Sequence, residues 1–281
     1  MKLANVKGRA ALVVGDQIAD IATVSNGRFG PDPMDPFLRW DSFLEFASST
    51  PGVTGPLIEA ELGNPVPHPR QVFAIGINYR NHAEEAGLAI PEVPAVFTKF
   101  PTSLAGPHDD VEVFGPAIDW EAELVAVIGR TADRVSEVDA WSVIAGLAVG
   151  QDVSDRHLQF AAGAQFSLGK SRRGYGPIGP WVVTVDEFAH PDDLAVGCSV
   201  NGEKMQEART SGLIFSVPRL VAEISAVLPL LPGDVIFTGT PAGIGAVRQP
   251  PRFLQPGDVL ETWVEGVGQL RNRFIAPAQQ P

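Results

Sequence analysis

The sequence predicts an α+β fold in which strands predominate over helices. Glycine (29 residues) and proline (25 residues) are abundant and scattered along the 281 residues, which favours many turns over a helical bundle. Segments with helical spacing are too few for a doubly wound sheet, and no strand leads through a glycine-rich turn into a helix as in dinucleotide-binding folds. The hydrophobic fraction of 44% is enough for a substantial core, in one large domain or in a large domain with a small one.

The first 69 residues are predicted to form a small N-terminal α+β region. Residues 10–24 should form two short strands around the turn signal Gly15-Asp16. A helix should begin at Asp35-Pro36, with Asp35 as its N-cap and apolar residues at helical spacing behind it. Three alternating prolines in residues 64–69 indicate a stiff connector, and His68 is interpreted as part of it. The main, catalytic domain is therefore predicted to span residues 70–281.

Residues 71–100 predict a strand, a helix and a second strand. The helix should be capped by Asn78 or Asn81 and should end at Gly87. His82 and Glu85 are three residues apart, so they share one face of this helix. The spacing by itself is equally compatible with a solvated helix surface.

Residues 119–129, Asp-Trp-Glu-Ala-Glu-Leu-Val-Ala-Val-Ile-Gly, form the most informative segment. Acidic and apolar side chains alternate as far as Glu123, so Glu121 and Glu123 point the same way in a strand; both faces then become apolar, as in a buried strand. Two neighbouring buried carboxylates repel each other unless a cation pairs with them. A divalent metal would supply that charge, and the alternative is a solvated strand face that ends at a sheet edge.

The segment after residue 142 carries a further set of polar candidates. Asp152 follows an apolar stretch and is either a functional carboxylate or a cap or turn residue. Ser154 is the predicted N-cap of a short helix that contains Arg156 and Gln159. Gly169-Lys170-Ser171 is not a phosphate-binding loop, because Ala164 occupies the position where that pattern requires glycine.

The C-terminal third predicts further strands and one helix. Strands are expected at residues 181–184 and 195–201, and Asn201-Gly202 is a strong hairpin-turn signal. Ser216 should cap a helix over residues 217–228. Pro-Gly turns should lead into strands at residues 231–238 and 255–262, and the loop between them could hold Thr240 in a fixed direction.

Charge and cysteine content limit the possible partners and the compartment. The formal net charge is −12 and no block of Lys or Arg stands out, so neither nucleic acid nor an anionic membrane is expected as a partner. The single cysteine, Cys198, can form no intrachain disulfide and no cysteine-rich zinc site. With no signal peptide or membrane span evident, we expect a soluble cytoplasmic protein.

Several motifs, in order, resemble the fumarylacetoacetate hydrolase superfamily over roughly residues 70–275. The motifs are residues 76–79 with His82 and Glu85, residues 97–103, residues 119–123, residues 150–159, Gly169-Lys170-Ser171 with residues 179–181, Asn201-Gly202, and residues 239–243. The resemblance implies a mixed β-sandwich roll that is usually a homodimer. It also implies one divalent cation, Mg²⁺ or Mn²⁺ (with Ca²⁺ as a substitute in crystals), bound by Glu121, Glu123 and Asp152.

The same resemblance implies roles for the remaining candidates. Lys170 should lie beside the metal, and a mobile lid should carry His82 and Glu85 as the pair that activates water. The implied substrate contacts are Tyr79, Arg156, Gln159 and Thr240. The chain departs from the family pattern at Arg172-Arg173, where two arginines could bind a second carboxylate or could simply be exposed.

The function that this resemblance implies is metal-dependent hydrolysis of a carbon–carbon bond. The substrate would be an acylpyruvate-type 2,4-dioxo acid similar to fumarylpyruvate or fumarylacetoacetate, in the catabolism of aromatic compounds. One alternative is an isomerase or decarboxylase that acts on a 2-oxo or 2-hydroxydienoic diacid, such as a 2-hydroxyhepta-2,4-diene-1,7-dioate isomerase or an oxaloacetate decarboxylase. A catalytically inactive, carboxylate-binding protein is the alternative from another class.

Overall fold

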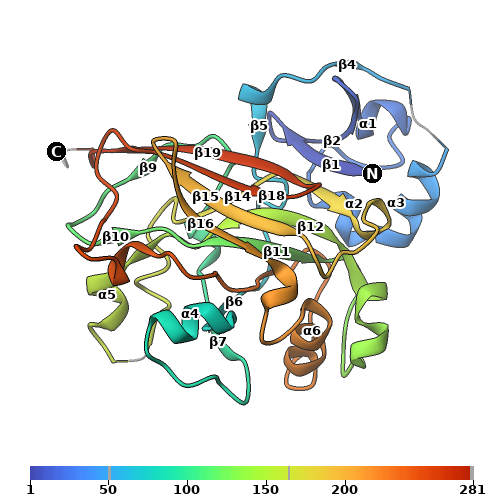
Figure 1. The fold of residues 1–281 in the computed structure, drawn as a ribbon. Helices are drawn as coiled ribbons and strands as arrows, with labels where there is room; N and C mark the ends of the chain where they lie inside the picture. The colour runs from blue at the N-terminus through green and yellow to red at the C-terminus, as the bar shows by residue number, and fades with distance from the viewer. Residues whose placement is uncertain (50–51, 164, 279–281) are drawn as a thin grey trace.

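A large mixed sheet is the framework of the molecule in the computed structural model, which describes residues 1–49, 52–163 and 165–278 (Figure 1). Its twelve strands are β1 (Lys2–Val6), β2 (Arg9–Val14), β3 (Gln17–Asp20), β4 (Gly55–Pro56), β5 (Leu62–Gly63), β6 (Val72–Gly76), β7 (Ala95–Thr98), β8 (Leu104–Ala105), β11 (Ala122–Ile128), β12 (Ile144–Gln151), β14 (Gly176–Thr184) and β17 (Val235–Phe237). The main path runs β4-β3-β2-β1-β14-β12-β11-β17-β6-β7, with β5 beside β1 and β8 beside β14.

A second sheet lies over one face of the first (Figure 1). Its five strands, in the order β16-β15-β18-β19-β9, are β9 (Val111–Glu112), β15 (Ala195–Val200), β16 (Glu203–Arg209), β18 (Val259–Val264) and β19 (Gly268–Ile275), and a separate pair comprises β10 (Ile118–Asp119) and β13 (Ser154–Asp155). The α-helices are α1 (Ile21–Val24), α2 (Asp35–Leu38), α3 (Trp40–Ala47), α4 (Arg80–Glu85), α5 (Arg156–Phe160) and α6 (Val217–Ser225). In the view of Figure 1, α4, α5 and α6 lie below the sheets, and α1, α2 and α3 lie at the N-terminal end. This architecture confirms the predicted β-rich α+β roll.

Strand β11 is buried on both faces, as its sequence predicts. Leu124 and Ala126 belong to the apolar cluster that fills the space between the two sheets. Val125 and Val127 belong to a second cluster on the opposite face, which also contains Phe37 of α2. The strand therefore runs through the middle of the core, and it places the acidic residues at its start inside the protein.

The predicted helix at Asp35 is wrong in two details. Asp35 is the first helical residue and not the cap, because its carboxylate accepts a hydrogen bond from Gly30 N. The helix also divides into α2 and α3 at Arg39, whose backbone leaves the helical region (φ −132°, ψ 43°). The Arg39 guanidinium there donates to Arg28 O at 2.7 Å, which stabilises the break.

Two further predicted caps belong to different residues. Neither Asn78 nor Asn81 caps α4, whose N-cap is Tyr79 without a side-chain bond. The Asn78 amide instead bonds the backbone of Phe215 and of Thr238, so it ties the start of this helix to two distant segments.

Helix α5 is capped by Asp155, whose carboxylate accepts from Leu158 N, and not by Ser154. Ser154 Oγ is engaged elsewhere, because it donates to Asp152 O at 2.9 Å. The N-cap is therefore one residue later in the chain than predicted. Ser154, which was expected to be the cap, instead stabilises the backbone at Asp152.

Other local predictions are confirmed. Ser216 caps α6 by accepting from Arg219 N, and Gly87, with φ +66°, follows the end of α4. Asn201 and Gly202 have φ of 52° and 82°, so both adopt the left-handed conformation that the hairpin between β15 and β16 requires. The two Pro-Gly turns precede β17 and β18.

The N-terminal region joins the sheet of the rest of the chain. Strand β1 pairs with β14, with Lys2 opposite Val183 and Leu3 opposite Val182. In Figure 1 this region lies at one end of the large sheet, beyond the C-terminal end of β14. A boundary near residue 69 between two separately folding domains stays a prediction.

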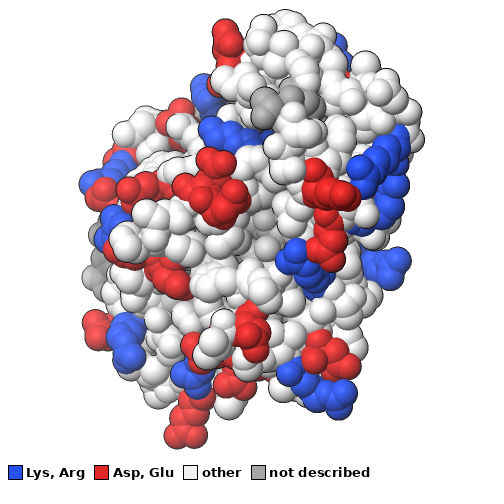
Figure 2. Space-filling view, turned by 90° about the vertical axis from the view of Figure 1, so that its right-hand side faces the viewer, with Lys and Arg blue, Asp and Glu red and all other residues white. Residues whose placement is uncertain are grey.

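The surface carries mixed charge on the face drawn in Figure 2, where acidic and basic side chains are interspersed among uncharged residues. No helix in the described part of the chain has the length and hydropathy that a membrane crossing requires. The predictions about partners and compartment stay predictions.

We expect Gly146→Ala to destabilise the fold. A Cβ at Gly146 in β12 would lie 2.3 Å from Val183 O, so β12 and β14 would have to separate. Overpacking of this kind costs about 1–3 kcal/mol of unfolding free energy. Gly55→Ala in β4 is the control, because no atom lies within 4 Å of its Cβ. Urea unfolding should show a lower midpoint for Gly146→Ala alone, and equal midpoints would contradict this account.

Candidate active site

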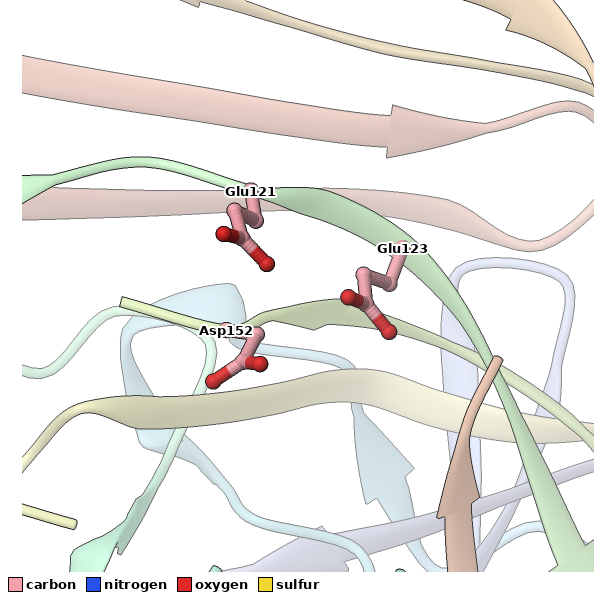
Figure 3. Close-up of side chains that lie close together, drawn as sticks. All are labelled: Glu121, Glu123 and Asp152. Atoms are coloured by element: carbon pink, nitrogen blue, oxygen red, sulfur yellow. The ribbon is translucent and has the colours of Figure 1, made fainter. Parts of the chain in front are cut away.

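Three buried carboxylates converge where β11 begins and β12 ends. Glu121, Glu123 and Asp152 each offer an oxygen within 4.8 Å of the others, and their side chains point toward one another (Figure 3). Glu123 pairs with Gly150 in the sheet, and Asp152 N donates to Glu121 O at 3.0 Å. The antiparallel pairing of β11 with β12 therefore brings together carboxylates about thirty positions apart in the sequence.

Two buried lysines neutralise part of this acidic cluster. Lys170 Nζ donates to Glu121 Oε2 at 2.8 Å and to Asp152 Oδ2 at 2.7 Å. Lys99 Nζ donates to Asp152 Oδ1 at 2.7 Å and also bonds Lys170 O. Burial lowers the pKa of Lys170, but the negative charges of Asp152 and Glu121 outweigh burial and raise it overall. Lys170 is therefore a fixed cation at this end of the site.

Arg156 links the acidic cluster to a second buried carboxylate. Its Nη1 lies 2.7 Å from Glu121 Oε1, and its Nε donates to Asp119 Oδ2 at 2.8 Å. Asp119 also accepts backbone hydrogen bonds from Gly245 and Ala246. Asp119 shares the alternating pattern with the two glutamates, but it contacts Arg156 and the loop at residues 245–246 and is not part of the carboxylate cluster.

Glu121 and Glu123 differ in their electrostatic surroundings. Burial raises the pKa of Glu121, but the charges of Lys170 and Arg156 overcome it and hold that pKa at about 2. Burial and the charges of Asp152 and Glu121 hold the pKa of Glu123 well above its usual range. Among the described residues Glu123 forms no ion pair, and its Oε2 accepts only from Gly239 N at 2.8 Å.

These carboxylates fit a divalent cation. Three buried oxygen donors, one of them without a cationic partner, are the ligand set that hard ions such as Mg²⁺ and Mn²⁺ prefer. The all-oxygen set does not suit zinc or copper sites, which use histidine and cysteine. Glu121, Glu123 and Asp152 could therefore hold such an ion.

A cavity of about 400 Å³ opens above the cluster. Glu121 and Lys170 form part of its floor, and Arg156, Gln159 and Thr240 also line it. Its size lies within the range of small-molecule sites. Three of the four residues predicted to contact substrate thus face the cavity, and the exception is Tyr79.

Helix α4 brings His82 to the same cavity. His82 is buried and lines the cavity, whereas Glu85 lies behind it with its Oε2 at 3.6 Å from His82 Nδ1. That separation is longer than a hydrogen bond, and Nδ1 has no hydrogen-bond partner among the described residues. Glu85 accepts from Gly243 N at 3.0 Å, so it also fastens the helix to the loop that carries Thr240.

The Thr240 hydroxyl is held by protein groups on two sides. It donates to Ala122 O at 3.0 Å and accepts from Gln206 Nε2 at 2.8 Å. Gln206 also accepts from Ala122 N at 2.8 Å, so one buried amide aligns the loop with the start of β11. Because its proton is already used, the hydroxyl is left as an acceptor toward a ligand.

The remaining candidates lie outside the cavity. Tyr79 is buried, and in the described part of the chain its hydroxyl has no hydrogen-bond partner; burial together with the charge of Glu123 raises its pKa. Arg172 pairs with Asp155 at 2.8 Å and stacks on Phe114, whereas Arg173 is exposed. Neither arginine lines the cavity, and Tyr79 would touch a ligand there only after a rearrangement.

Sequence reasoning missed Lys99, Gln206 and the partner of Asp119. Residues 97–103 are one of the motifs that carry the family resemblance, but the strand predicted there runs to residue 100 and gives Lys99 no role. A lysine within an otherwise apolar motif is the signal that could have identified a buried cation. Gln206 lies in the exposed-looking sequence of β16 and gave no signal.

The chain resembles known proteins over nearly its whole length. The family model described as fumarylacetoacetate (FAA) hydrolase, C-terminal, matches residues 71–275. The mitochondrial oxaloacetate tautomerase Fahd2a of Rattus norvegicus is 35% identical over 269 residues, which cover 93% of this chain and 85% of that protein.

Two solved structures share the fold and the length. A candidate HpcE protein from Mycobacterium smegmatis superimposes with a TM-score of 0.94 at 50% identity and covers 99% of this chain and 100% of its own. Maleylpyruvate hydrolase from Sphingobium sp. SYK-6, in complex with manganese(II) and pyruvate, has a TM-score of 0.80 at 28% identity, with 99% and 100% covered. The chain belongs to the fumarylacetoacetate hydrolase family.

Proposed function

We propose that this protein is a divalent-metal-dependent hydrolase that cleaves the carbon–carbon bond of an acylpyruvate-type 2,4-dioxo acid. The observation that carries the proposal is the position of His82, which lines the same cavity as Glu121 and Lys170, with Glu85 behind it. A general base opposite an acidic metal-binding cluster is the arrangement that water activation requires. The manganese and pyruvate complex of maleylpyruvate hydrolase supports the same chemistry.

The ion would be held by Glu121, Glu123 and Asp152, and when bound it supplies Lewis-acid stabilisation of negative charge on a substrate oxygen. Lys170 and Arg156 offset the charge of the carboxylates and admit an anionic 2-oxo acid. Gln159 also lines the cavity; its Oε1 accepts from Arg156 Nη1 at 3.0 Å, so its amide nitrogen would be the group that donates to a substrate oxygen.

His82 moves the proton in this proposal. Its Nδ1 faces Glu85, so Nε2 is the nitrogen that takes a proton from water. The hydroxide oxygen adds to the distal carbonyl carbon, and the bond between that carbon and the neighbouring methylene breaks. The electron pair remains on the methylene carbon, which takes a proton from His82, so that the products are pyruvate and a carboxylic acid. Glu85 stabilises the charged imidazole in between.

The second candidate is isomerisation or decarboxylation of a 2-oxo diacid at the same site. The similarity to an oxaloacetate tautomerase favours it, since keto–enol exchange needs only a proton shuttle such as His82. Acylpyruvates and 2-oxo diacids, screened with Mg²⁺ and with Mn²⁺ in ¹⁸O-labelled water, separate the two. Hydrolysis puts the label into the released acid and forms no CO₂. Turnover of a diacid without label uptake, with acylpyruvates untouched, would exclude the hydrolase.

We expect residues 78–92 to behave as a lid. In the structure α4 is fastened to the loop of Thr240 by few contacts, chiefly Glu85 to Gly243. Asn78 and the buried Tyr79 anchor the start of this segment, but few large buried apolar side chains hold the residues after them, so the amides there should exchange quickly in the free protein. Addition of Mg²⁺ and oxalate should slow the exchange there while β11 stays protected in both states. Equal exchange with and without the ligand would contradict the lid.

A further inference from the structure

The cavity above the acidic cluster has two chemically different ends. Its charged side chains, Glu121, Arg156 and Lys170, lie with His82 at the end next to the carboxylates. Apart from Gln159 and Thr240, the remainder of the wall is apolar and includes Ile77, Leu88 and Phe166. A molecule that places its 2-oxo acid group at the charged end must therefore extend into apolar surroundings.

Three aromatic rings follow one another from the charged end toward the cavity mouth. Lys170 Nζ lies 5.4 Å from the centroid of the Phe97 ring, which contacts Phe166 edge-to-face at 5.8 Å. Phe166 in turn contacts Phe160 in the same manner at 5.6 Å. The rings mark the direction in which the bound molecule continues away from the carboxylates.

The described residues supply no free cation at the apolar end of the cavity. Of the basic side chains among the described lining residues, Lys170 is bonded to Glu121 and Asp152, and Arg156 is paired with Asp119 and Glu121. His82 lies at the charged end. A second carboxylate on the substrate would thus be placed among phenylalanine and aliphatic side chains without a partner, which is costly.

Two lining side chains are also unusually exposed for their type. Leu88 is 53% exposed and Phe160 is 59% exposed, and both border the cavity. An apolar group that binds between them would remove this surface from water, which is favourable. A charged group in the same place would not gain this favourable free energy, because it would lose its own hydration.

The backbone at Ile77 supports a binding role for this wall. Ile77 has φ +54°, a left-handed conformation that β-branched residues rarely adopt and that carries strain. The adjacent Asn78 amide holds it there through bonds to Phe215 and Thr238. The fold thus maintains a strained residue in order to present an isoleucine side chain to the cavity.

We propose that the apolar end selects substrates with an uncharged, apolar acyl group. The preferred substrate is then a monocarboxylic 2,4-dioxo acid with a branched alkyl or aryl tail, and not a diacid. This inference rests on the proposed function for the reaction itself, and it narrows the expected fumarylpyruvate-like substrates to those without a second carboxylate.

The test compares two acylpyruvates of the same shape. In 4-methylpentanoylpyruvate an isopropyl group stands in the place of the terminal carboxylate of succinylpyruvate. We expect kcat/KM of the wild-type protein with Mg²⁺ to be at least about 100-fold higher for the apolar compound, since the lost solvation of the carboxylate has no replacement. Equal rates, or a preference for succinylpyruvate, would overturn the inference and leave the hydrolase proposal intact.

A binding measurement tests the apolar end of the cavity independently of whether the protein is a hydrolase. Calorimetry with Mg²⁺ should show tighter binding of 6-methyl-2-oxoheptanoate than of 2-oxoadipate, its carboxylate counterpart, neither of which can be cleaved. If neither acylpyruvate is cleaved but this order holds, the hydrolase proposal fails and the apolar site stands. Equal affinities would reject the apolar site by themselves.

Leu88→Arg places a cation at the apolar end of the cavity. It should reduce the preference for 4-methylpentanoylpyruvate over succinylpyruvate at least tenfold, mainly by lowering KM for succinylpyruvate. Val138→Arg is the matched control, because Val138 is 93% exposed and does not line the cavity, so its preference should equal that of wild type. A change of equal size in both variants would show that net charge, and not the cavity wall, sets the preference.

Discussion

Replacing Glu121, Glu123 or Asp152 by alanine is expected to abolish detectable activity and to weaken Mg²⁺ binding. All three carboxylates converge on one buried point, so each would supply a ligand oxygen. A Lewis-acid ion contributes several kcal/mol to the reaction, and its loss should lower the rate by more than about 10³-fold. Calorimetry that shows unchanged Mg²⁺ affinity in all three variants would rule out these residues as metal ligands.

The variants should differ in the stability of the metal-free protein. Asp152→Ala leaves both Lys99 and Lys170 without their shared partner in a buried site, which costs about 3–5 kcal/mol of unfolding free energy. Glu123→Gln removes a buried carboxylate that forms no ion pair among the described residues, so it should be neutral or stabilising. Thermal melts with and without Mg²⁺ check both statements: Glu123→Gln should melt no lower than wild type and should lose the shift that the ion causes.

Replacing His82 by alanine is expected to lower kcat for acylpyruvate cleavage by about 10²–10⁴, the usual contribution of a general base. The Mg²⁺ affinity should stay unchanged, because His82 is not among the three clustered carboxylates. The variant therefore separates loss of proton transfer from loss of the ion. Normal turnover by His82→Ala would exclude His82 as the base.

Glu85 needs two substitutions, because the structure gives it two contacts. Glu85→Ala removes both the charge near His82 and the acceptor for Gly243 N, whereas Glu85→Gln keeps an acceptor oxygen. We expect Glu85→Gln to lower kcat less than His82→Ala does, without faster amide exchange in residues 78–92. Glu85→Ala should add faster exchange, and identical exchange in the two variants would show that the bond to Gly243 does not hold the lid.

The alternation in residues 119–123 was sufficient to place Glu121 and Glu123 side by side, because strand geometry is local. Asp152 and Lys170 could be assigned only through the resemblance, since their approach to Glu121 depends on pairing between distant segments. The burial of Lys99 and the contacts of Gln206 also depend on such pairing and were not predicted.

Local signals failed where a side chain had a stronger tertiary partner. Asn78 has the chemistry of a helix cap, but it bonds Phe215 and Thr238 instead. Asp35 likewise bonds Gly30 N and not the first turn of its helix. In contrast, Ser216 also donates to Glu137, and the Asn201 side chain bonds Asp258 and Val259, but these bonds leave the cap and the turn intact, so both were predicted correctly.

Strands β6 and β7 pair with each other, and the proposed lid lies in the connection between them. That single connection, residues 77–94, carries His82 together with Ile77 and Leu88 of the apolar wall. The clustered carboxylates lie elsewhere, in β11 (Glu123), directly before β11 (Glu121) and directly after β12 (Asp152). Because the paired strands fix both ends of the connection, its sequence can change with little effect on the ion-binding end. The carboxylates that could hold the ion and one part of the apolar wall are thus encoded in separate segments of the gene. If the proposed substrate preference holds, a relative's connection that keeps His82 could be grafted here to change that part of the wall.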